Sequence, residues 1–296
     1  MTMNRLLALT LTFAVAAPLV FASGTPAADD PEIAAGNPEI AALQVGLRAQ
    51  GLYAGTVDGL LGPNTKTALR KLQKRSGLVA NGVLNQRTRE ALGRYGRHSP
   101  LGARPLSLGV KGWDVAALQF ALAWHGFPSS TLDGRLGSHT DVALRSFQAW
   151  AGIRANGVAG PSTVAALRAP QPRSPLMLSR PLPGPLGDRF GPRGARFHAG
   201  VDFPAATGTA IAAAAAGRVV FAAASGSGWG KMVVLAHGQG VRTRYAHLSR
   251  INVQVGQRVV AGSTVGLVGA TGEASGPHLH FEVLLRGANV DPLTAF

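Results

Sequence analysis

The chain has no cysteine among its 296 residues. This excludes disulfide bonds, thiol nucleophiles and cysteine-ligated zinc, so any metal site must be built from histidines and carboxylates. Aromatic residues make up only 6% of the chain, and no stretch interleaves lysines with aromatics as a nucleic-acid surface would. Acidic residues are also scarce, 14 against 29 basic ones, which gives a formal net charge of +15. This balance indicates an anionic partner, such as nucleic acid, acidic lipid or an anionic wall polymer.

The apolar stretch near the N-terminus is too short for a membrane span, which needs about 20 residues. It covers residues 6–20, contains Pro18, follows Arg5 and is followed by a small-residue exit at Ala22. These features are typical of a secretory signal peptide, predicted over 1–22, with a flexible lead-in over 23–37. The alternatives are an uncleaved anchor and cleavage after Ala27 or Ala28. We expect a secreted protein of the cell wall or periplasm, without nucleic-acid partners and without stable membrane insertion after signal cleavage.

Two segments repeat each other without gaps at one constant offset, which indicates a duplicated small domain rather than a solenoid. We define residues 38–97 as repeat 1 and residues 104–168 as repeat 2. Leucines at helical spacing, Asx-Gly turns and threonines near helix starts predict three helices in each repeat. Asp58 and Asp133 are interpreted as turn formers first and ligand contacts second. The matching segments include Leu43-Gln44 with Leu118-Gln119, Asp58-Gly59 with Asp133-Gly134, and Asn81-Gly82-Val83 with Asn156-Gly157-Val158.

The pattern changes after repeat 2. Residues 169–185 are rich in proline and are predicted to form an extended, semi-stiff spacer that holds the repeats and the C-terminal domain apart while tethering them. From residue 186 to 296, short β-type runs are separated by glycine-containing turns, which predicts a mostly antiparallel β domain. The fold class is therefore multidomain α plus β. The expected strands cover residues 218–222, 232–237, 243–247, 257–260, 264–268 and 278–285.

Two short motifs in this domain contain metal-ligand residues. His278 and His280 lie one residue apart in an expected strand and should therefore project from the same face. Upstream, His198 and Asp202 are four residues apart, which gives them the same parity in a strand and the same face in a helix. Two histidines and one carboxylate suit a catalytic zinc whose fourth coordination position stays open. Spacing alone does not say which of His278 and His280 would bind the metal.

Both parts of the chain resemble known families. The pattern shared by the repeats resembles the small helical peptidoglycan-binding domain of wall hydrolases, which implies binding to bacterial peptidoglycan but not which repeat binds. Residues 186–296 resemble the lysostaphin/LytM-type zinc endopeptidases, the β-lytic metallopeptidase family. That resemblance rests on four motifs in order, although Pro192 and Lys231 depart from the family pattern where a substrate groove could run. The motifs are Phe190-Gly191-Pro192-Arg193, His198-x-x-x-Asp202, Tyr245-Ala246-His247-Leu248-Ser249 and Gly276-Pro277-His278-Leu279-His280-Phe281-Glu282.

The family resemblance implies a role for each motif histidine. His198, Asp202 and His280 take the metal-ligand positions for Zn2+, and His247 and His278 take the positions of catalytic histidines. A histidine with a pKa near neutrality can accept and return a proton during amide hydrolysis. We favour His278 as the base because it neighbours the ligand His280, although the two catalytic histidines could divide these roles either way.

Other polar residues are given structural interpretations first. Glu282 could point into the cleft, but a strand carboxylate paired with a nearby arginine is the preferred interpretation. His237 is expected in a turn, and Arg193 either orients a peptide carboxylate or braces the loop before His198. Three histidines are expected on the surface of the repeat region, and these are His98, His125 and His139.

The sequence supports one function above its alternatives, a secreted zinc endopeptidase that hydrolyses peptide cross-links of peptidoglycan and is targeted by tandem wall-binding domains. Anionic wall polymers are additional candidate partners. The second hypothesis is a non-catalytic wall-binding activator of another hydrolase, and the third is a basic protein that binds nucleic acid or surfaces. The bond cleaved, whether the wall is the cell's own, any latency and the oligomeric state do not follow from the sequence.

Overall fold

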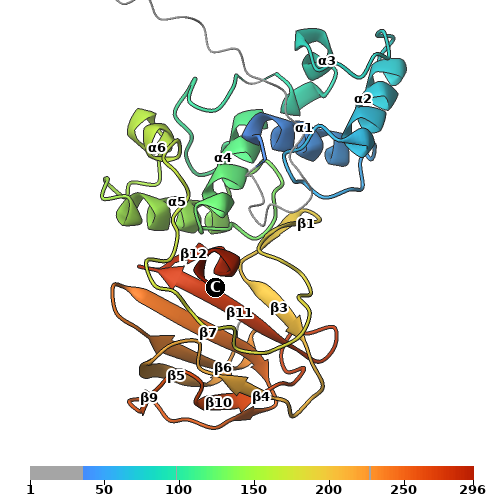
Figure 1. The fold of residues 1–296 in the computed structure, drawn as a ribbon. Helices are drawn as coiled ribbons and strands as arrows, with labels where there is room; N and C mark the ends of the chain where they lie inside the picture. Colours follow the sequence, from blue (N-terminus) through green and yellow to red (C-terminus); the bar gives the residue numbers. More distant parts are fainter. Residues whose placement is uncertain (1–35, 98, 227) are drawn as a thin grey trace, which may run out of the picture. The chain divides into compact units, whose positions relative to one another are not determined.

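A computed structural model describes residues 36–97, 99–226 and 228–296 (Figure 1). The expected signal peptide (1–22), most of the lead-in (23–37) and His98 lie outside these residues. None of the helices in the described ranges is long and apolar enough to cross a membrane.

Each repeat forms three α-helices, as predicted. The helices are α1 (Pro38–Ala49), α2 (Pro63–Arg75) and α3 (Gln86–Glu90) in repeat 1, with the 3₁₀ helix η1 (Gly93–Tyr95), and α4 (Trp113–Trp124), α5 (Ser138–Trp150) and α6 (Pro161–Ala166) in repeat 2. Proline begins α1, α2 and α6, where its fixed φ suits the first turn and its missing N–H has no partner to lose. Side chains of asparagine cap α1 and α3: Asn37 Oδ1 accepts from Glu39 N at 2.8 Å, and Asn85 Oδ1 accepts from Thr88 N at 2.9 Å.

A buried glutamine explains the Asx-Gly signature of the repeats. Gln44 donates from Nε2 to Asp58 Oδ1 (2.6 Å), Leu60 O (3.1 Å) and Thr65 Oγ1 (3.0 Å), and its Oε1 accepts from Gly59 N (2.9 Å). Gly59 adopts a φ of 73°, which favours glycine. The aspartate is thus a turn former, as predicted, and the glutamine satisfies the polar groups of the turn and of the next helix start.

The same network occurs four times, because each repeat contains it twice. The second network of repeat 1 joins Gln73 to the Asn81-Gly82 turn and Thr88, so a helix–glutamine–turn–threonine unit recurs within the repeat. In repeat 2 the two networks centre on Gln119 and Gln148. The repeats pack together through α1 and α4, and the buried leucines of repeat 1 share one hydrophobic core with Trp113 of repeat 2. Most leucines of repeat 2, such as Leu118 and Leu144, form a second core.

The C-terminal domain is built from antiparallel strands, which confirms the predicted fold class. Its seven-stranded sheet has the order β12-β11-β7-β6-β5-β9, with β3 also paired to β11 (Figure 1). Each of the six expected strands is present, with ends at most three residues from the predicted ones. The longer strands are β5 (Gly217–Ser225), β6 (Gly230–Ala236), β7 (Val241–Leu248), β10 (Thr264–Leu267) and β11 (His278–Leu285).

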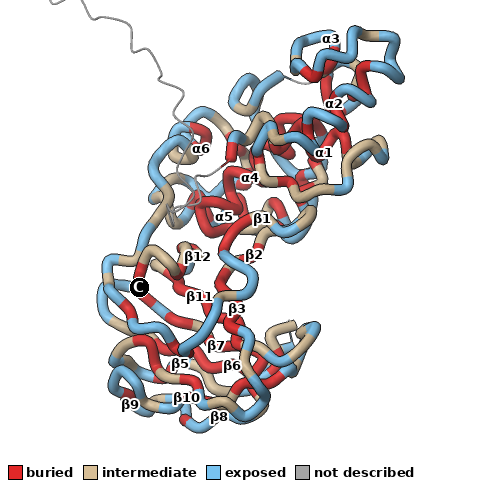
Figure 2. Tube along the Cα trace, turned by 45° about the vertical axis from the view of Figure 1, so that its right-hand side comes forward, coloured by how far each residue is buried: buried red, intermediate tan, exposed pale blue. Residues whose placement is uncertain are grey.

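Short strands complete the domain and were not predicted, apart from β9 (Arg258–Val259). They form a two-stranded hairpin, β1-β2, and a three-stranded sheet, β4-β10-β8. Both β7 and β11 are buried along most of their length (Figure 2). The short strands are β1 (Gly191–Arg193), β2 (Arg196–His198), β3 (Val201–Pro204), β4 (Ala210–Ala212), β8 (Arg250–Ile251) and β12 (Ala288–Val290), followed by the 3₁₀ helix η2 (Pro292–Ala295).

The prediction that residues 169–185 hold the domains apart is wrong. Leu178 and Leu182 of this segment are 6% and 1% exposed and belong to the core, because Leu178 N donates to Ala295 O at 2.6 Å and Ala212 N donates to Pro181 O. Repeat 2 also contacts the β domain directly, since Trp150 Nε1 donates to Leu285 O at 3.1 Å.

The prediction that His125 lies on the surface is also wrong. Its side chain is 5% exposed at the C-terminal end of α4, where its ring packs edge-on against Phe147. Nε2 lies 3.0 Å from Leu167 O, which makes it the donor, and so the ring closes the core of repeat 2. His139 is exposed, as predicted.

Candidate active site

Strand β11 separates core residues from site residues by its alternation. Leu279 and Phe281 are fully buried in the hydrophobic core, whereas His278 and His280 line a cavity of about 310 Å³ on the other side of the strand. The predicted same-face arrangement of the two histidines is therefore confirmed.

A glycine allows the second motif to approach this strand. His198 ends β2 and Asp202 lies in β3, and in the pairing of β3 with β11 Asp202 stands directly opposite His280. A Cβ at Gly200 would lie 2.3 Å from Phe281 O, so only glycine permits this close approach. The turn between the short strands thus places both residues of the His-x-x-x-Asp motif beside His280.

Three donor atoms converge in the cavity. His198 Nε2 lies 3.0 Å from His280 Nδ1 and 3.1 Å from Asp202 Oδ1, and His280 Nδ1 lies 2.8 Å from Asp202 Oδ1. These three residues are 5–7% exposed and form a group that could hold a metal ion. Zinc bound at 2.0–2.1 Å separates its ligands by about 3.3 Å, close to the distances found here. The donor set and its spacing therefore fit a divalent cation.

Burial and hydrogen bonds act in opposite directions on the pKa values of Asp202 and His280. Burial by itself raises the pKa of Asp202, but hydrogen bonds from His198 and His280 outweigh it and hold this pKa well below its usual range. Burial lowers the pKa of His280, but its hydrogen bonds to Asp202 and Glu282 raise it to about 9 in the metal-free protein. Asp202 is thus an anion at every physiological pH, as a metal ligand must be.

Glu282 holds the far side of the His280 ring. Its Oε1 lies 3.1 Å from His280 Nε2, and its Oε2 accepts from Arg244 Nη1 and from Asn289 Nδ2 (2.8 Å). Glu282 is fully buried and does not line the cavity, so the preferred interpretation as an arginine-paired carboxylate is confirmed and the cleft position is wrong. Its bond to His280 is additional, and it orients the ring so that Nδ1 faces Asp202 and His198.

His247 owes its position to an irregularity in β7. The pairing of β6 with β7 shifts register next to it, and His247 has a φ of 62°, in the left-handed region that non-glycine residues seldom adopt. Such strain is often stored at functional sites. The bulge turns the imidazole into the cavity, with its ring 4.8 Å from that of His278.

The two remaining histidines are fixed in the same manner. His247 Nδ1 lies 2.8 Å from Thr271 O, and His278 Nδ1 lies 2.8 Å from Gly276 O, so each Nδ1 carries the hydrogen. The Nε2 atom of each ring is then the acceptor, and His278 Nε2 lies 3.8 Å from Asp202 Oδ1. Burial lowers the pKa of His247, which keeps it neutral at pH 7.

Comparison with known families identifies the parts of the chain. Residues 196–292 match peptidase family M23, and residues 36–92 and 111–167 match a peptidoglycan binding domain. The chain carries an M23 peptidase domain and two peptidoglycan-binding domains. The M23 match includes Asp202 and the four histidines that line the cavity.

Named relatives match about two fifths of this chain or less. The chain is 39% identical over 122 residues to the DD-carboxypeptidase/endopeptidase Mpg of Neisseria meningitidis serogroup B, covering 40% of this chain and 28% of that protein. It is 43% identical over 105 residues to lysostaphin of Staphylococcus staphylolyticus, covering 35% and 21%. The chain therefore spans less than a third of the length of these relatives.

Parts of the chain are also similar to solved structures. The catalytic domain of lysostaphin from Staphylococcus simulans is 36% identical and covers 37% of this chain and 89% of that one, with a TM-score of 0.35. A zinc containing peptidase from Vibrio cholerae is 33% identical and covers 39% of each chain, with a TM-score of 0.37.

The other sequence-based interpretations fall into place around the M23 cavity. Arg193 lines it and also pairs with Asp188 at 2.9 Å, so it braces the loop before His198 while facing the site. His237 bonds Ala216 O and Thr243 Oγ1 at the end of β6, which supports its turn role. Neither Pro192 nor Lys231 lines the cavity.

The sequence reasoning missed several residues of the site. Trp229 lines the cavity with its ring 5.1 Å from that of His280, and Arg244 lies over the outer face of this tryptophan at 4.8 Å. Glu273 and Ser275 also line the cavity. The only signal for Arg244 is its place in β7 opposite Glu282, and that pairing is visible only once the strand register is known.

Proposed function

We propose that this chain is a secreted, zinc-dependent endopeptidase that hydrolyses peptide cross-links of bacterial peptidoglycan. The observation that carries the proposal is the convergence of His198, Asp202 and His280 beside two histidines whose Nε2 atoms accept protons. The M23 family and the two peptidoglycan-binding domains support it. So do the relatives, among which the Vibrio cholerae ShyA protein is named a peptidoglycan DD-endopeptidase.

The three convergent residues would hold the zinc ion. When bound, zinc supplies a Lewis acid that polarises the scissile carbonyl and makes a water molecule acidic enough to attack near neutral pH. Asp202 is an anion that offsets the charge of the cation, and Glu282 keeps His280 Nδ1 directed towards the site. These two carboxylates therefore have different tasks, one inside the cavity and one behind it.

His278 and His247 handle the proton. His278 Nε2 lies 3.8 Å from Asp202 Oδ1, beside the proposed metal ligands. From this position His278 accepts the proton of the attacking water and returns it to the leaving amine as the C–N bond breaks. His247, held neutral by burial, lies beside His278 and provides a second acceptor for the reacting groups. Both Nδ1 atoms are tied to backbone carbonyls, so neither ring needs to reorient during the reaction.

Replacing a metal ligand tests this proposal directly. Asp202→Ala and His280→Ala should each lose bound zinc and reduce hydrolysis of purified sacculi by more than about a thousandfold, because the chemistry has no other nucleophile. Zinc content would be measured by elemental analysis and released fragments by mass spectrometry, with and without a chelator.

His139→Ala is the matched control, because it removes an exposed histidine of repeat 2 that lies outside the site. Undiminished hydrolysis in the Asp202 or His280 variants would contradict the endopeptidase. Wall binding by a wild-type protein that holds no zinc and releases no fragments would instead support the activator hypothesis.

A further inference from the structure

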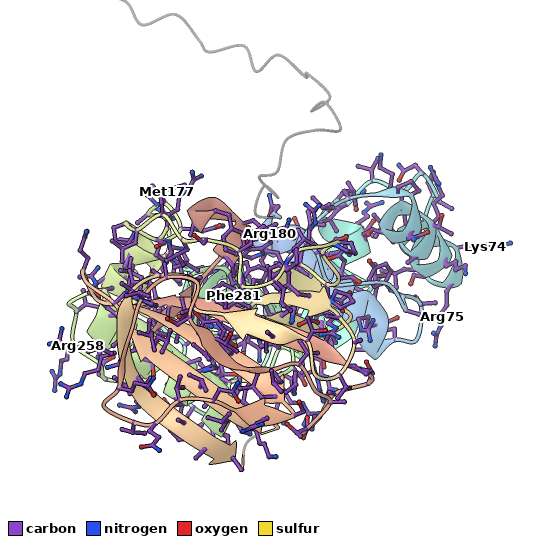
Figure 3. The ribbon with its side chains drawn as sticks, turned by 60° about the horizontal axis from the view of Figure 1, so that its bottom comes forward. Lys74, Arg75, Met177, Arg180, Arg258 and Phe281 are labelled. Atoms are coloured by element: carbon purple, nitrogen blue, oxygen red, sulfur yellow. The ribbon has the colours of Figure 1, made fainter. Side chains whose placement is uncertain are left out.

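The two repeats share a fold but differ on the solvent-facing side of their second helix. In α2 of repeat 1, this side carries five exposed cations and no acidic residue. Within residues 36–97, 99–226 and 228–296, none of the five pairs with a carboxylate. Figure 3 shows two of them, Lys74 and Arg75, projecting outward from the helix. The five cations are Lys66, Arg70, Lys71, Lys74 and Arg75.

Repeat 2 has lost this basic face. At the equivalent positions, α5 carries one cation, and that cation is neutralised, because Arg145 Nε lies 2.8 Å from Asp141 Oδ2 one helical turn away. The three positions besides this ion pair hold small or aromatic residues. In order, the five equivalents are Asp141, Arg145, Ser146, Ala149 and Trp150.

Repeat 2 docks onto the M23 domain through the equivalent side of α5 and through the end of α4. Trp150, equivalent to Arg75, donates to Leu285 O and lies 5.3 Å under the guanidinium of Arg286. Trp124 at the end of α4 is 5% exposed and packs edge-on against Phe197 of β2, with ring centroids 5.3 Å apart. Gly126 O, beyond the end of α4, accepts from Asn289 N at 3.1 Å.

Repeat 1 lacks both docking tryptophans. The residue equivalent to Trp124 is Ala49, which is exposed at the end of α1. Burying a tryptophan contributes far more free energy than an alanine can, so the two tryptophans account for the attachment of repeat 2. The duplicated domain has therefore diverged into a docked copy and a copy whose charged helix faces solvent.

We propose that repeat 1 is the wall-binding module and that it holds peptidoglycan through the basic face of α2, whereas repeat 2 is an intramolecular scaffold for the M23 domain. The ligand groups are the carboxylates of the peptidoglycan peptides. Lys66, Arg70 and Lys74 follow one another at four-residue spacing and form a row about 12 Å long. Such a row suits a polymer with repeated negative charges.

Peptidoglycan fits this face better than nucleic acid does. The solvent-facing side of α2 has no aromatic side chain on which a base could stack, and stacking supplies much of the affinity for single-stranded nucleic acid. The inference rests on the proposed function, because it takes the substrate of the M23 domain as the polymer that repeat 1 holds.

Neutralising the basic face tests the inference in the full chain. The triple variant Lys66→Gln, Arg70→Gln, Lys74→Gln should bind sacculi stripped of attached polymers at least about tenfold more weakly, because each exposed ionic contact contributes modestly. Binding would be measured by co-sedimentation over a range of salt concentrations. Hydrolysis of a soluble cross-linked fragment should not change, because these residues lie outside the catalytic cavity.

A matched triple variant separates a local face from total charge. Arg154→Gln, Arg242→Gln, Arg258→Gln removes the same charge from exposed positions in repeat 2 and the M23 domain, of which Arg258 appears in Figure 3. It should bind sacculi like the wild type. Wild-type protein should also lose binding to sacculi whose carboxylates have been amidated.

Three results would overturn the inference: an unchanged affinity of the repeat 1 variant, an equal loss in the matched variant, or wild-type binding to DNA in preference to sacculi. Failure of the proposed function looks different, because the wild type would then leave the soluble fragment intact whatever the state of α2.

Discussion

At the scale of single residues, His280 is the most constrained member of the site. One ring nitrogen faces Asp202 and His198, and the other bonds Glu282, which is itself held by Arg244 and Asn289. A ligand histidine supported by a carboxylate is more basic and better oriented than a free one. The buried charge of Glu282 is tolerated because Arg244 compensates it, and removing either partner alone would leave an unpaired charge.

Replacing Glu282 by Gln should therefore weaken metal binding. The amide keeps the shape and can still accept from His280 Nε2, but it removes the negative charge behind the ring, so zinc affinity should fall about 10- to 100-fold. Affinity would be measured by competition with a chromophoric chelator, alongside a thermal melt of the metal-free protein.

Glu273→Gln serves as the comparison, since Glu273 lines the same cavity but is exposed. If Glu282→Gln lowered only the melting temperature and bound zinc like the wild type, Glu282 would be a structural residue without influence on His280.

At the scale of elements, the sequence predicted the long strands and the parity within them. In β11 the alternation of His278, Leu279, His280 and Phe281 matches the alternation of cavity and core, because a strand projects successive side chains to opposite faces. The helices of the repeats were equally predictable, since Leu43 and Leu47 repeat at helical spacing and asparagines cap the starts.

What could not be predicted depends on contacts between distant segments. Strands of two to four residues, such as β2 and β3, are too short to show periodicity, although they carry His198 and Asp202. The convergence of these residues on His280 required the family resemblance. The bulge that turns His247 inward and the cross-strand partner Arg244 arise from register, which one sequence does not display.

His125, at the end of α4, makes repeat 2 sensitive to acid. Burial lowers its pKa, an effect that the hydrogen bond to Leu167 O only partly offsets, and Nδ1 is buried without a hydrogen-bond partner. The folded state thus disfavours the protonated ring, whereas the unfolded chain accepts a proton below about pH 6.5. Stability from this residue is present above that pH and is lost as the pH falls below it.

Replacing His125 by Gln should flatten this dependence. Glutamine is the natural choice because Gln50, its equivalent in repeat 1, donates to Ala91 O at 3.1 Å and does not titrate. Between pH 7.5 and pH 5, the wild type should lose on the order of 1 kcal/mol more than the variant, the typical cost of an unsatisfied buried donor. Denaturant melts at both pH values would measure it, and parallel losses in the two proteins would show that His125 does not titrate in the folded state.

At the scale of the whole molecule, the described residues from Gly36 to Phe296 belong to one compact unit in which the domains share a core. The β1-β2 hairpin shows this, because Gly194 O accepts from Val57 N of repeat 1 and Ala195 O accepts from Leu132 N of repeat 2. This hairpin ends at His198, so both repeats support a candidate metal ligand. A domain boundary that is predicted from composition alone misses such contacts.

The proline-rich segment gives the clearest consequence of this arrangement. A fragment of residues 186–296 lacks Leu178 and Leu182, whose burial contributes about 1.5–3 kcal/mol each, a large share of the stability of a small domain. It should therefore melt more than about 10 °C below a fragment of residues 175–296, which keeps both leucines and their backbone hydrogen bonds. Both fragments lack repeat 2 equally, so the difference between their melting temperatures isolates the contribution of the segment.

Leu178→Ala with Leu182→Ala in the full chain should also lower the melting temperature, because the cavities left behind remove the same contacts. Equal melting temperatures for the two fragments would mean that the segment is a spacer after all, as its composition alone indicates.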